Sequence, residues 1–351
     1  MSATGTGMGV PLIPTELLLS IIELSLPPFH PTLGRLPQLD RLRVFALVSP
    51  TFRDIAQTFM WKVAEYDPRG DRVFKAVKLA VENERCKKLA AQARTVRVRG
   101  AAVQGDREIW RKLEWLHPRT GSLWLSQTQS PRDIFDRSYR SGLYSLHLDY
   151  HKSGSRIIFN EGTVFPVLRR LAVWTCHWDD LTTILDAAPT FPNLQKLFLL
   201  LSFSGRRPSP TTFPGSPTSL TRSITSLSLL AEVNFGDIEL PWRLLSLFPA
   251  LTHLRIGVRG RKSPNHDFSR LARHLPLQLE TLALLEGIPL TSSVVAKALK
   301  REGPRSLRRL SLHELKDFDG DIEIQEACQD LGIELVDEGQ VPADKEFWLS
   351  Y

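Results

Sequence analysis

The chain has 351 residues, of which 42% are hydrophobic and 24% are charged, and its formal net charge is +7. This composition is that of a globular protein with a large core, and it excludes disorder of the whole chain. The positive charge permits an acidic partner but is equally typical of an ordinary soluble surface. Three widely separated cysteines, Cys86, Cys176 and Cys328, follow no metal spacing and favour a reducing compartment, cytoplasmic or nuclear.

Residues 1–9 are small and polar, and we expect a flexible tail there. They lack the basic and then apolar regions of a secretory signal. The longest apolar run, Leu197 to Leu201, is far shorter than the ~20 residues of a spanning helix, so no membrane partner is expected.

Residues 10–61 carry the pattern of three short helices. Pro14 and Glu16 suit a first helical turn, and an apolar stripe follows. A Pro-rich connection leads to a second helical pattern, after which Ser49 and Pro50 have the order of an N-cap and a first helical residue. The apolar positions of the three helices are Leu17, Leu18, Ile21 and Ile22, then Leu39, Leu42, Phe45, Ala46 and Val48, then Phe52, Ile55, Ala56 and Phe59.

Residues 13–61 resemble an F-box, through Ile-Pro-x-Glu-Leu-x-x-x-Ile-Ile, then Leu-Arg-x-Phe-Ala-Leu-Val-Ser-x-x-Phe-Arg, and a terminal Trp61. The resemblance implies docking onto the Skp-type adaptor of a cullin-based ubiquitin ligase. The chain departs from the family in a long first connection, from Ser25 to Gln38, and in Phe52, where tryptophan is commoner. The positions that match the family's adaptor contacts are Pro14, Leu17, Ile21, Leu47, Val48 and Phe52.

Residues 62–93 form a connecting segment, in which the pattern from Asp71 to Ala93 predicts a helix. We expect this helix to cap the first strand of the following domain, Thr95 to Arg99, because terminal units of repeat arrays need a cover.

Residues 94–338 repeat the pattern apolar-x-x-apolar-x-apolar, most clearly from Phe165 to Val173 and from Phe191 to Leu199. Successive copies lie 23 to 30 residues apart, which is the spacing of leucine-rich repeats. The last two apolar positions are two apart, so on a short strand they share one face. The middle positions of the ten copies are Val96, Leu123, Leu146, Leu171, Leu197, Leu227, Leu254, Leu282, Leu310 and Ile333.

The chain from Thr95 to Val336 is therefore similar to irregular leucine-rich repeats. That resemblance implies an α/β solenoid of about ten short parallel strands on a concave face, with helices and loops on the convex face. Helical spacing between the strands, as in Leu181, Ile184 and Leu185, supports the convex layer. The asparagine or cysteine expected after the strand is present only as Cys176, so regular curvature is not expected.

Two segments have loop-like composition. Residues 204–223 are rich in serine and proline and predict a protruding loop that interrupts the array. Residues 339–351 are expected to form a C-terminal tail.

No motif in the sequence indicates catalysis or a cofactor. Phosphate loops, zinc-protease motifs, paired cysteines and nucleophile elbows are absent, and the nine histidines are scattered. We therefore expect no enzyme activity, no cofactor and no metal, and the predicted function is recognition of a protein target for a ubiquitin ligase. A stand-alone interaction scaffold is the alternative, and binding of nucleic acid through a basic face is a third, weaker hypothesis.

Alternation along the middle strands predicts the target site on the concave face. There, large apolar side chains should form a contiguous patch with a basic rim, which is the composition of a protein-binding anchor. The other interpretation is that the loop after residue 203 covers these side chains, or that they fold into the core. The predicted site residues are Arg170, Trp174, Lys196, Phe198, Leu200, Leu230 and Arg255.

Overall fold

The computed structural model describes residues 14–26, 36–66, 82–99, 111, 113, 115–126, 142–149, 163–176, 178–202, 217–233, 239–260, 268–285, 292–312 and 322–337. The predicted N-terminal tail, the predicted C-terminal tail and most of the predicted Ser/Pro-rich loop lie outside these residues.

The three predicted N-terminal helices are confirmed as α1 (Thr15–Ser25), α2 (Leu36–Ala46) and α3 (Pro50–Lys62). Ser49 is the N-cap of α3, as expected, because its hydroxyl accepts a hydrogen bond from the Phe52 N–H at 3.2 Å. The helices enclose a small core of their own, made of Leu18, Ile22, Leu42, Ile55 and Ala56.

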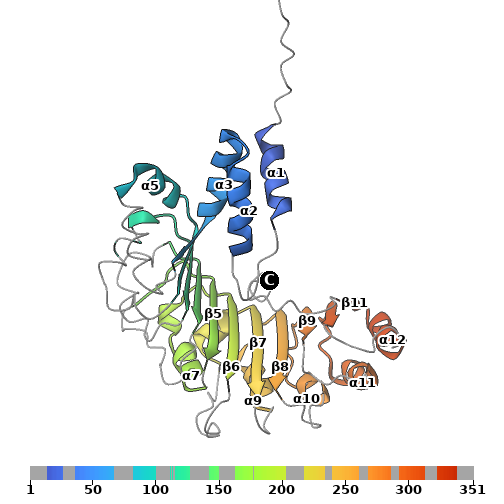
Figure 1. The fold of residues 1–351 in the computed structure, drawn as a ribbon. Coiled ribbons are helices and arrows are strands. Elements are labelled where there is room, and N and C mark those ends of the chain that lie inside the picture. Colours follow the sequence, from blue (N-terminus) through green and yellow to red (C-terminus); the bar gives the residue numbers. More distant parts are fainter. Residues whose placement is uncertain are drawn as a thin grey trace, which may run out of the picture.

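The strands form one parallel sheet of eleven strands in chain order, drawn as a curved row in Figure 1. The first four are β1 (Val63–Tyr66), β2 (Thr95–Arg99), β3 (Ser122–Ser126) and β4 (Ser145–Asp149). The middle four are β5 (Arg170–Cys176), β6 (Lys196–Ser202), β7 (Ser226–Val233) and β8 (His253–Gly260). The last three are β9 (Thr281–Leu284), β10 (Arg309–Leu312) and β11 (Glu334–Asp337).

The repeat spacing predicts the register of this sheet correctly from β2 to β10. Val96 pairs with Leu123, and each predicted middle position pairs with the next one as far as Leu310. The last copy is misaligned in the prediction, because Leu310 pairs with Leu335 and not with Ile333. Ile333 precedes the strand but is buried, so the sequence has an apolar residue there. The repeat pattern counts that apolar residue as a strand position.

The first strand of the sheet is β1, and the prediction that Thr95–Arg99 is first is wrong. β1 begins at Val63, directly after α3 ends at Lys62, and it pairs with β2. Its core-facing residues are Ala64 and Tyr66, which lack the repeated aliphatic pair of the other strands. The three helices are therefore joined to the sheet without a linker.

The predicted helix from Asp71 to Ala93 is shorter in the described part, where α5 (Glu84–Ala90) begins after the extended backbone of Asn83; residues 67–81 lie outside the described residues. α5 contacts the middle of α3, since Arg85 Nη2 lies 2.9 Å from Asp54 Oδ1 and 2.9 Å from Gln57 Oε1. The segment thus connects with the N-terminal helices as well as with the sheet.

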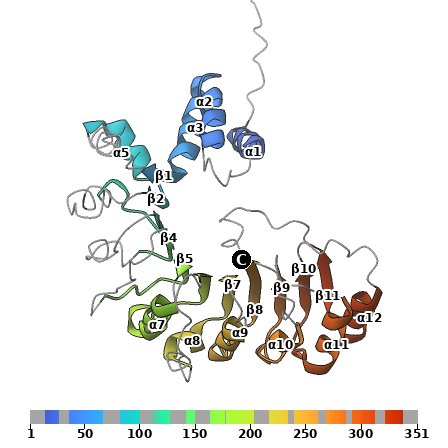
Figure 2. The ribbon, with the colours of Figure 1, turned by 60° about the horizontal axis from the view of Figure 1, so that its bottom comes forward.

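Helices cover the outer side of the curved sheet, as Figure 2 shows for α7 to α12. They pack on the apolar strand positions, which with them form a single continuous core. Part of the predicted loop at 204–223 is instead α8, capped by the Thr218 hydroxyl, which accepts from the Thr221 N–H at 3.3 Å. The outer elements are α7 (Trp178–Asp186), η4 (Ala188–Thr190), α8 (Ser219–Ser223), α9 (Glu239–Leu244), η6 (Leu245–Leu247), α10 (Phe268–Ala272), α11 (Ser292–Glu302) and α12 (Ile322–Leu331).

Candidate functional site

The N-terminal helices present an exposed apolar surface. The apolar stripe of α1 is divided: Leu18 and Ile22 are buried in the helical core, whereas Leu17 and Ile21 are 55% and 48% exposed. Leu47 and Val48, in the turn before α3, are 87% and 62% exposed. We call Leu17, Ile21, Leu47 and Val48 the module face.

Two further predicted contact residues differ in exposure. Pro14 is exposed at the start of α1. Phe52 is only partly buried, and its ring stacks on Phe45 with centroids 6.0 Å apart. Phe52 therefore supports the helical core as well as the adjacent surface.

The inner side of the sheet brings the predicted apolar residues together. Trp174, Phe198, Leu200 and Leu230 form one cluster with Ala172 and Leu285, separate from the main core. The Trp174 and Phe198 rings lie 4.3 Å apart between centroids. We call these six residues the inner cluster.

The predicted exposure of the inner cluster is wrong, since Trp174, Phe198, Leu200 and Leu230 are only 1–7% exposed. Arg255, predicted as part of the basic rim, is also buried at 6%. Alternation along a strand shows which side of a sheet a residue occupies, but it carries no information about whether that side is covered. The patch therefore has the burial of a second core and not of an open anchor.

A cavity of about 230 Å³ lies beside this cluster, over the first halves of strands β2 to β7. Arg170 and Lys196 pair in register on β5 and β6, so their side chains lie on the same side of the sheet. Among the described residues that line the cavity, none is acidic. Its charged and aromatic lining includes Arg97, Trp124, Tyr144, His147, Arg170, Lys196 and Phe198, and its hydroxyl lining includes Ser122, Ser145, Ser226 and Ser228.

One wall of the cavity is a stack of three side chains from neighbouring strands. The guanidinium of Arg97 lies 4.2 Å from the Trp124 ring centroid, and the Trp124 ring stacks on the His147 ring at 4.2 Å. His147 Nε2 lies 2.7 Å from the Ser145 hydroxyl. His147 Nδ1 is buried, and it has no hydrogen-bond partner among the described residues.

The positive charges of the cavity disfavour further protonation. Burial, together with Arg97 and Arg170, lowers the pKa of His147 to about 3, so its ring is neutral at pH 7. Burial and the neighbouring Arg170 also lower the pKa of Lys196. An anion in the cavity would relieve this repulsion.

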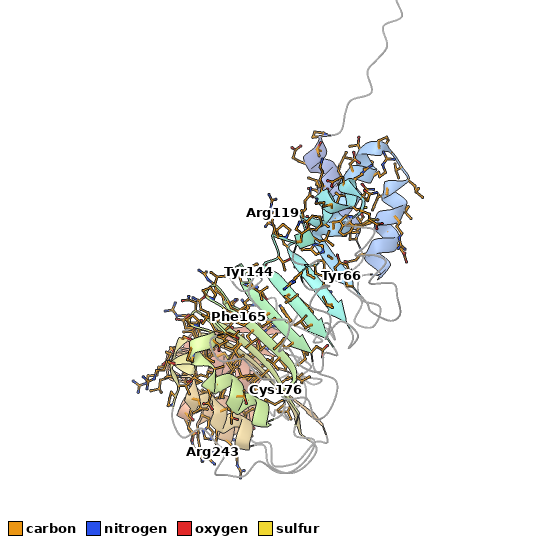
Figure 3. The ribbon with its side chains drawn as sticks, turned by 90° about the vertical axis from the view of Figure 1, so that its left-hand side faces the viewer. Tyr66, Arg119, Tyr144, Phe165, Cys176 and Arg243 are labelled. Atoms are coloured by element: carbon orange, nitrogen blue, oxygen red, sulfur yellow. The ribbon has the colours of Figure 1, made fainter. Side chains whose placement is uncertain are left out.

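The sequence interpretation included Arg170, Lys196 and Phe198 but omitted Trp124, Tyr144 and His147 as site residues. The strand register could have identified two of them. Trp124 and His147 occupy the same position in their strands as Ala172 and Phe198 do in theirs, so all four lie on the same side of the sheet. Tyr144 lies just before β4, at the start of the strands (Figure 3). Its ring packs over Gly121, where any Cβ would collide with it.

A buried hydrogen-bond network joins α5 to β1 through His117. His117 Nδ1 donates to the Ala90 carbonyl at 2.7 Å, so its Nε2 accepts from the Tyr66 hydroxyl at 2.5 Å. Figure 3 shows Tyr66 on the strand beside the helices. Burial raises the pKa of Tyr66; it also lowers the pKa of His117, although the Ala90 bond opposes this, and both groups are neutral at pH 7.

Neither a protein-family model nor a curated protein matches this chain. In the part of the chain that the structure describes, no group of three or more His, Cys, Asp or Glu side chains could hold a metal ion. No helix within the described ranges has the length and apolar character needed to cross a membrane.

Proposed function

We propose that this chain is the target-recognition subunit of a Skp–cullin–F-box ubiquitin ligase, with α1 to α3 binding the Skp-type adaptor and the repeat-like sheet binding a target protein. The observation that carries the proposal is the module face. Large apolar side chains that are 48–87% exposed, in α1 and in the turn before α3, are typical of a protein-binding surface.

The exposed residues coincide with the positions that the F-box resemblance assigns to adaptor contact. Leu17 and Ile21 are turned away from the helical core although Leu18 and Ile22 beside them are buried in it. If these helices served only as a cap, polar side chains at positions 17 and 21 would suit the contact with water better than leucine and isoleucine do. A partner protein that covers Leu17 and Ile21 would explain why both side chains are apolar.

Co-purification with a Skp-type adaptor tests this proposal. The full chain should capture the adaptor, and the double variant Leu17→Asp/Ile21→Asp should not, because both side chains are exposed and their replacement leaves the helical core intact. A matched control is Leu277→Asp/Leu331→Asp, which changes two exposed leucines of the repeat-like region, 84% and 44% exposed. Equal capture by the two double variants would refute adaptor binding through α1.

A stand-alone scaffold is the second candidate, and one observation favours it. α3 continues directly into β1, and α5 contacts α3 and contributes Ala90 to the core of the sheet, which is compatible with a cap for the first strand. Under this hypothesis, no Skp-type adaptor should co-purify with the full chain under any salt condition.

A further inference from the structure

The residues immediately before strands β2 to β10 lie in a row along one edge of the sheet, which we call the edge row. Backbone hydrogen bonds fix this row. The N–H of Gly121 donates to the Arg94 carbonyl, that of Tyr144 donates to the Gly121 carbonyl and that of Arg169 donates to the Tyr144 carbonyl, each at 2.9 Å. Neighbouring strands lie about 4.8 Å apart, so about 14 Å of the row separates Arg94 from Arg169.

The part of this edge from β2 to β5 is positively charged. Arg94 and Arg169 are exposed, and so is Arg119 in the turn before β3. These three arginines form no ion pair with a described residue. Among the described residues between Arg85 and Arg170, the one acidic residue is Asp149, and it lies at the opposite end of β4.

The later part of the edge row has a different charge. The row continues through the neutral residues Gln195, Thr225 and Thr252 before β6 to β8. Before β9 and β10 it holds Glu280 beside Arg308, whose N–H donates to the Glu280 carbonyl at 2.9 Å. Unopposed positive charge is therefore confined to the first part of the row.

Two exposed aromatic side chains accompany these arginines. Tyr144 is 45% exposed, and its ring packs over Gly121, so the ring is held in place while part of it stays open to a ligand. Trp115, four residues before Arg119, is 50% exposed, and Lys87 Nζ lies 4.2 Å from its ring centroid. Figure 3 shows Arg119 and Tyr144 at the same edge of the sheet.

We infer that this edge binds single-stranded nucleic acid, with Arg94, Arg119 and Arg169 contacting phosphates and Tyr144 stacking on a base. Sites for single strands combine cations that follow the backbone with aromatic side chains on which bases of any type stack. None of these residues belongs to the module face, so this binding is independent of the proposed adaptor contact.

An acidic protein is the other partner that such a charge attracts. Charge alone would satisfy an acidic protein, whereas exposed rings among the arginines match the stacking that a nucleic acid offers. The observations therefore favour the nucleic acid, and an acidic polypeptide serves as the competing ligand in the test.

Fluorescence anisotropy of the full chain with labelled oligouridine and oligothymidine of about 15 nucleotides tests the inference. Binding of either oligonucleotide supports it, and a preference identifies RNA or DNA as the ligand. Arg94→Gln/Arg119→Gln/Arg169→Gln should weaken binding by about tenfold or more at about 50 mM salt. It should also reduce the slope of log K against log salt concentration by about 2, since each lost phosphate contact removes about 0.7.

Two variants of Tyr144 test the stacking contact separately. Tyr144→Ala should weaken binding by about fivefold or more and leave the salt slope unchanged, because the ring contributes no charge. Tyr144→Phe keeps the ring and should bind like the unchanged protein. Equal binding by Tyr144→Ala and the unchanged protein would remove the stacking contact and overturn the inference.

A matched control is Arg301→Gln/Arg305→Gln/Arg308→Gln, which removes three exposed positive charges near β10 and should bind like the unchanged protein. Circular dichroism melting verifies that each variant is folded. The inference is overturned if neither oligonucleotide binds at low salt, or if the two triple variants lose binding equally. Polyglutamate that binds as tightly as the oligonucleotides would also overturn it and would indicate an acidic protein partner.

Discussion

At the residue scale, His147 and Lys196 show how burial and neighbouring positive charges together lower the pKa of a basic side chain. His147 is 6% exposed, lies close to two arginines and is neutral at neutral pH. Its position could be read from the repeat spacing, which places it on the strand side opposite Leu146 and Leu148. Its burial could not, because burial depends on the neighbouring Trp124 ring and on the curvature of the sheet.

His147 should make stability depend on pH. Its pKa is near 6.5 when unfolded and about 3 when folded, so between these values the unfolded chain binds more protons. The stabilisation from the neutral ring is complete above about pH 6.5, decreases by about 1.4 kcal/mol per pH unit below it, and is lost as the pH falls through the folded pKa. Urea unfolding of the unchanged protein and of His147→Phe measures this, and parallel stability–pH profiles would contradict it.

Tyr66 should stabilise the attachment of α5 to β1, the first strand of the sheet. Tyr66→Phe removes the donor to His117 Nε2 and leaves a buried acceptor unsatisfied, so we expect a loss of about 1–3 kcal/mol in unfolding free energy. Tyr144→Phe is the control, because Tyr144 is 45% exposed. Denaturant titration of both variants gives the comparison, and equal midpoints would rule out a stabilising network.

At the element scale, α1 illustrates what a hydrophobic stripe can and cannot reveal. The sequence predicts a helix with Leu17, Leu18, Ile21 and Ile22 on its apolar side, and the helix is present. The stripe is wider than the helical core, so only Leu18 and Ile22 are buried. Which half of the stripe faces inward depends on where α2 and α3 lie, and helix spacing contains no such information.

The different burial of Leu17 and Leu18 predicts that their truncation to alanine changes stability by very different amounts. Leu18→Ala should cost about 2–5 kcal/mol of stability, because it opens a cavity in the helical core. Leu17→Ala should change stability by about 0.5 kcal/mol or less, because the side chain is exposed. Thermal unfolding followed by circular dichroism distinguishes them, and a larger loss in Leu17→Ala would reverse the assignment of the two faces.

The inner cluster belongs to the same scale, because β5, β6 and β7 supply all of its residues except Leu285. Trp174→Ala and Phe198→Ala should each cost about 3–5 kcal/mol, as expected for buried aromatic residues. Val164→Ala is a control at a site 40% exposed. If both aromatic variants melt like the unchanged protein, the inner cluster is an exposed surface as the sequence first suggested.

At the scale of the whole molecule, a one-dimensional stack of strands explains why so much of the fold follows from the sequence. Each repeat contacts mainly its neighbours, so the spacing of Leu171, Leu197 and Leu227 is enough to place three strands in register. The repeat pattern did not predict β1, because Ala64 and Tyr66 occupy the positions where the other strands have larger aliphatic residues. Its place at the start of the sheet depends on its pairing with Val96 and Val98.

α3 continues directly into β1, so no linker separates the N-terminal helices from the sheet. The module face is attached to the sheet without a flexible linker, so a target on the inner side would be held in a defined orientation relative to an adaptor on the helices. Whether the molecule acts this way depends first on whether the module face binds the adaptor.

Isothermal titration of the purified full chain with a Skp-type adaptor, alongside Leu17→Asp/Ile21→Asp and Leu277→Asp/Leu331→Asp, tests that claim most directly. The unchanged protein and the Leu277/Leu331 variant should bind one adaptor each with the same affinity, and the Leu17/Ile21 variant should show no binding heat. Absence of binding by the unchanged protein, or undiminished binding by the Leu17/Ile21 variant, would contradict the account.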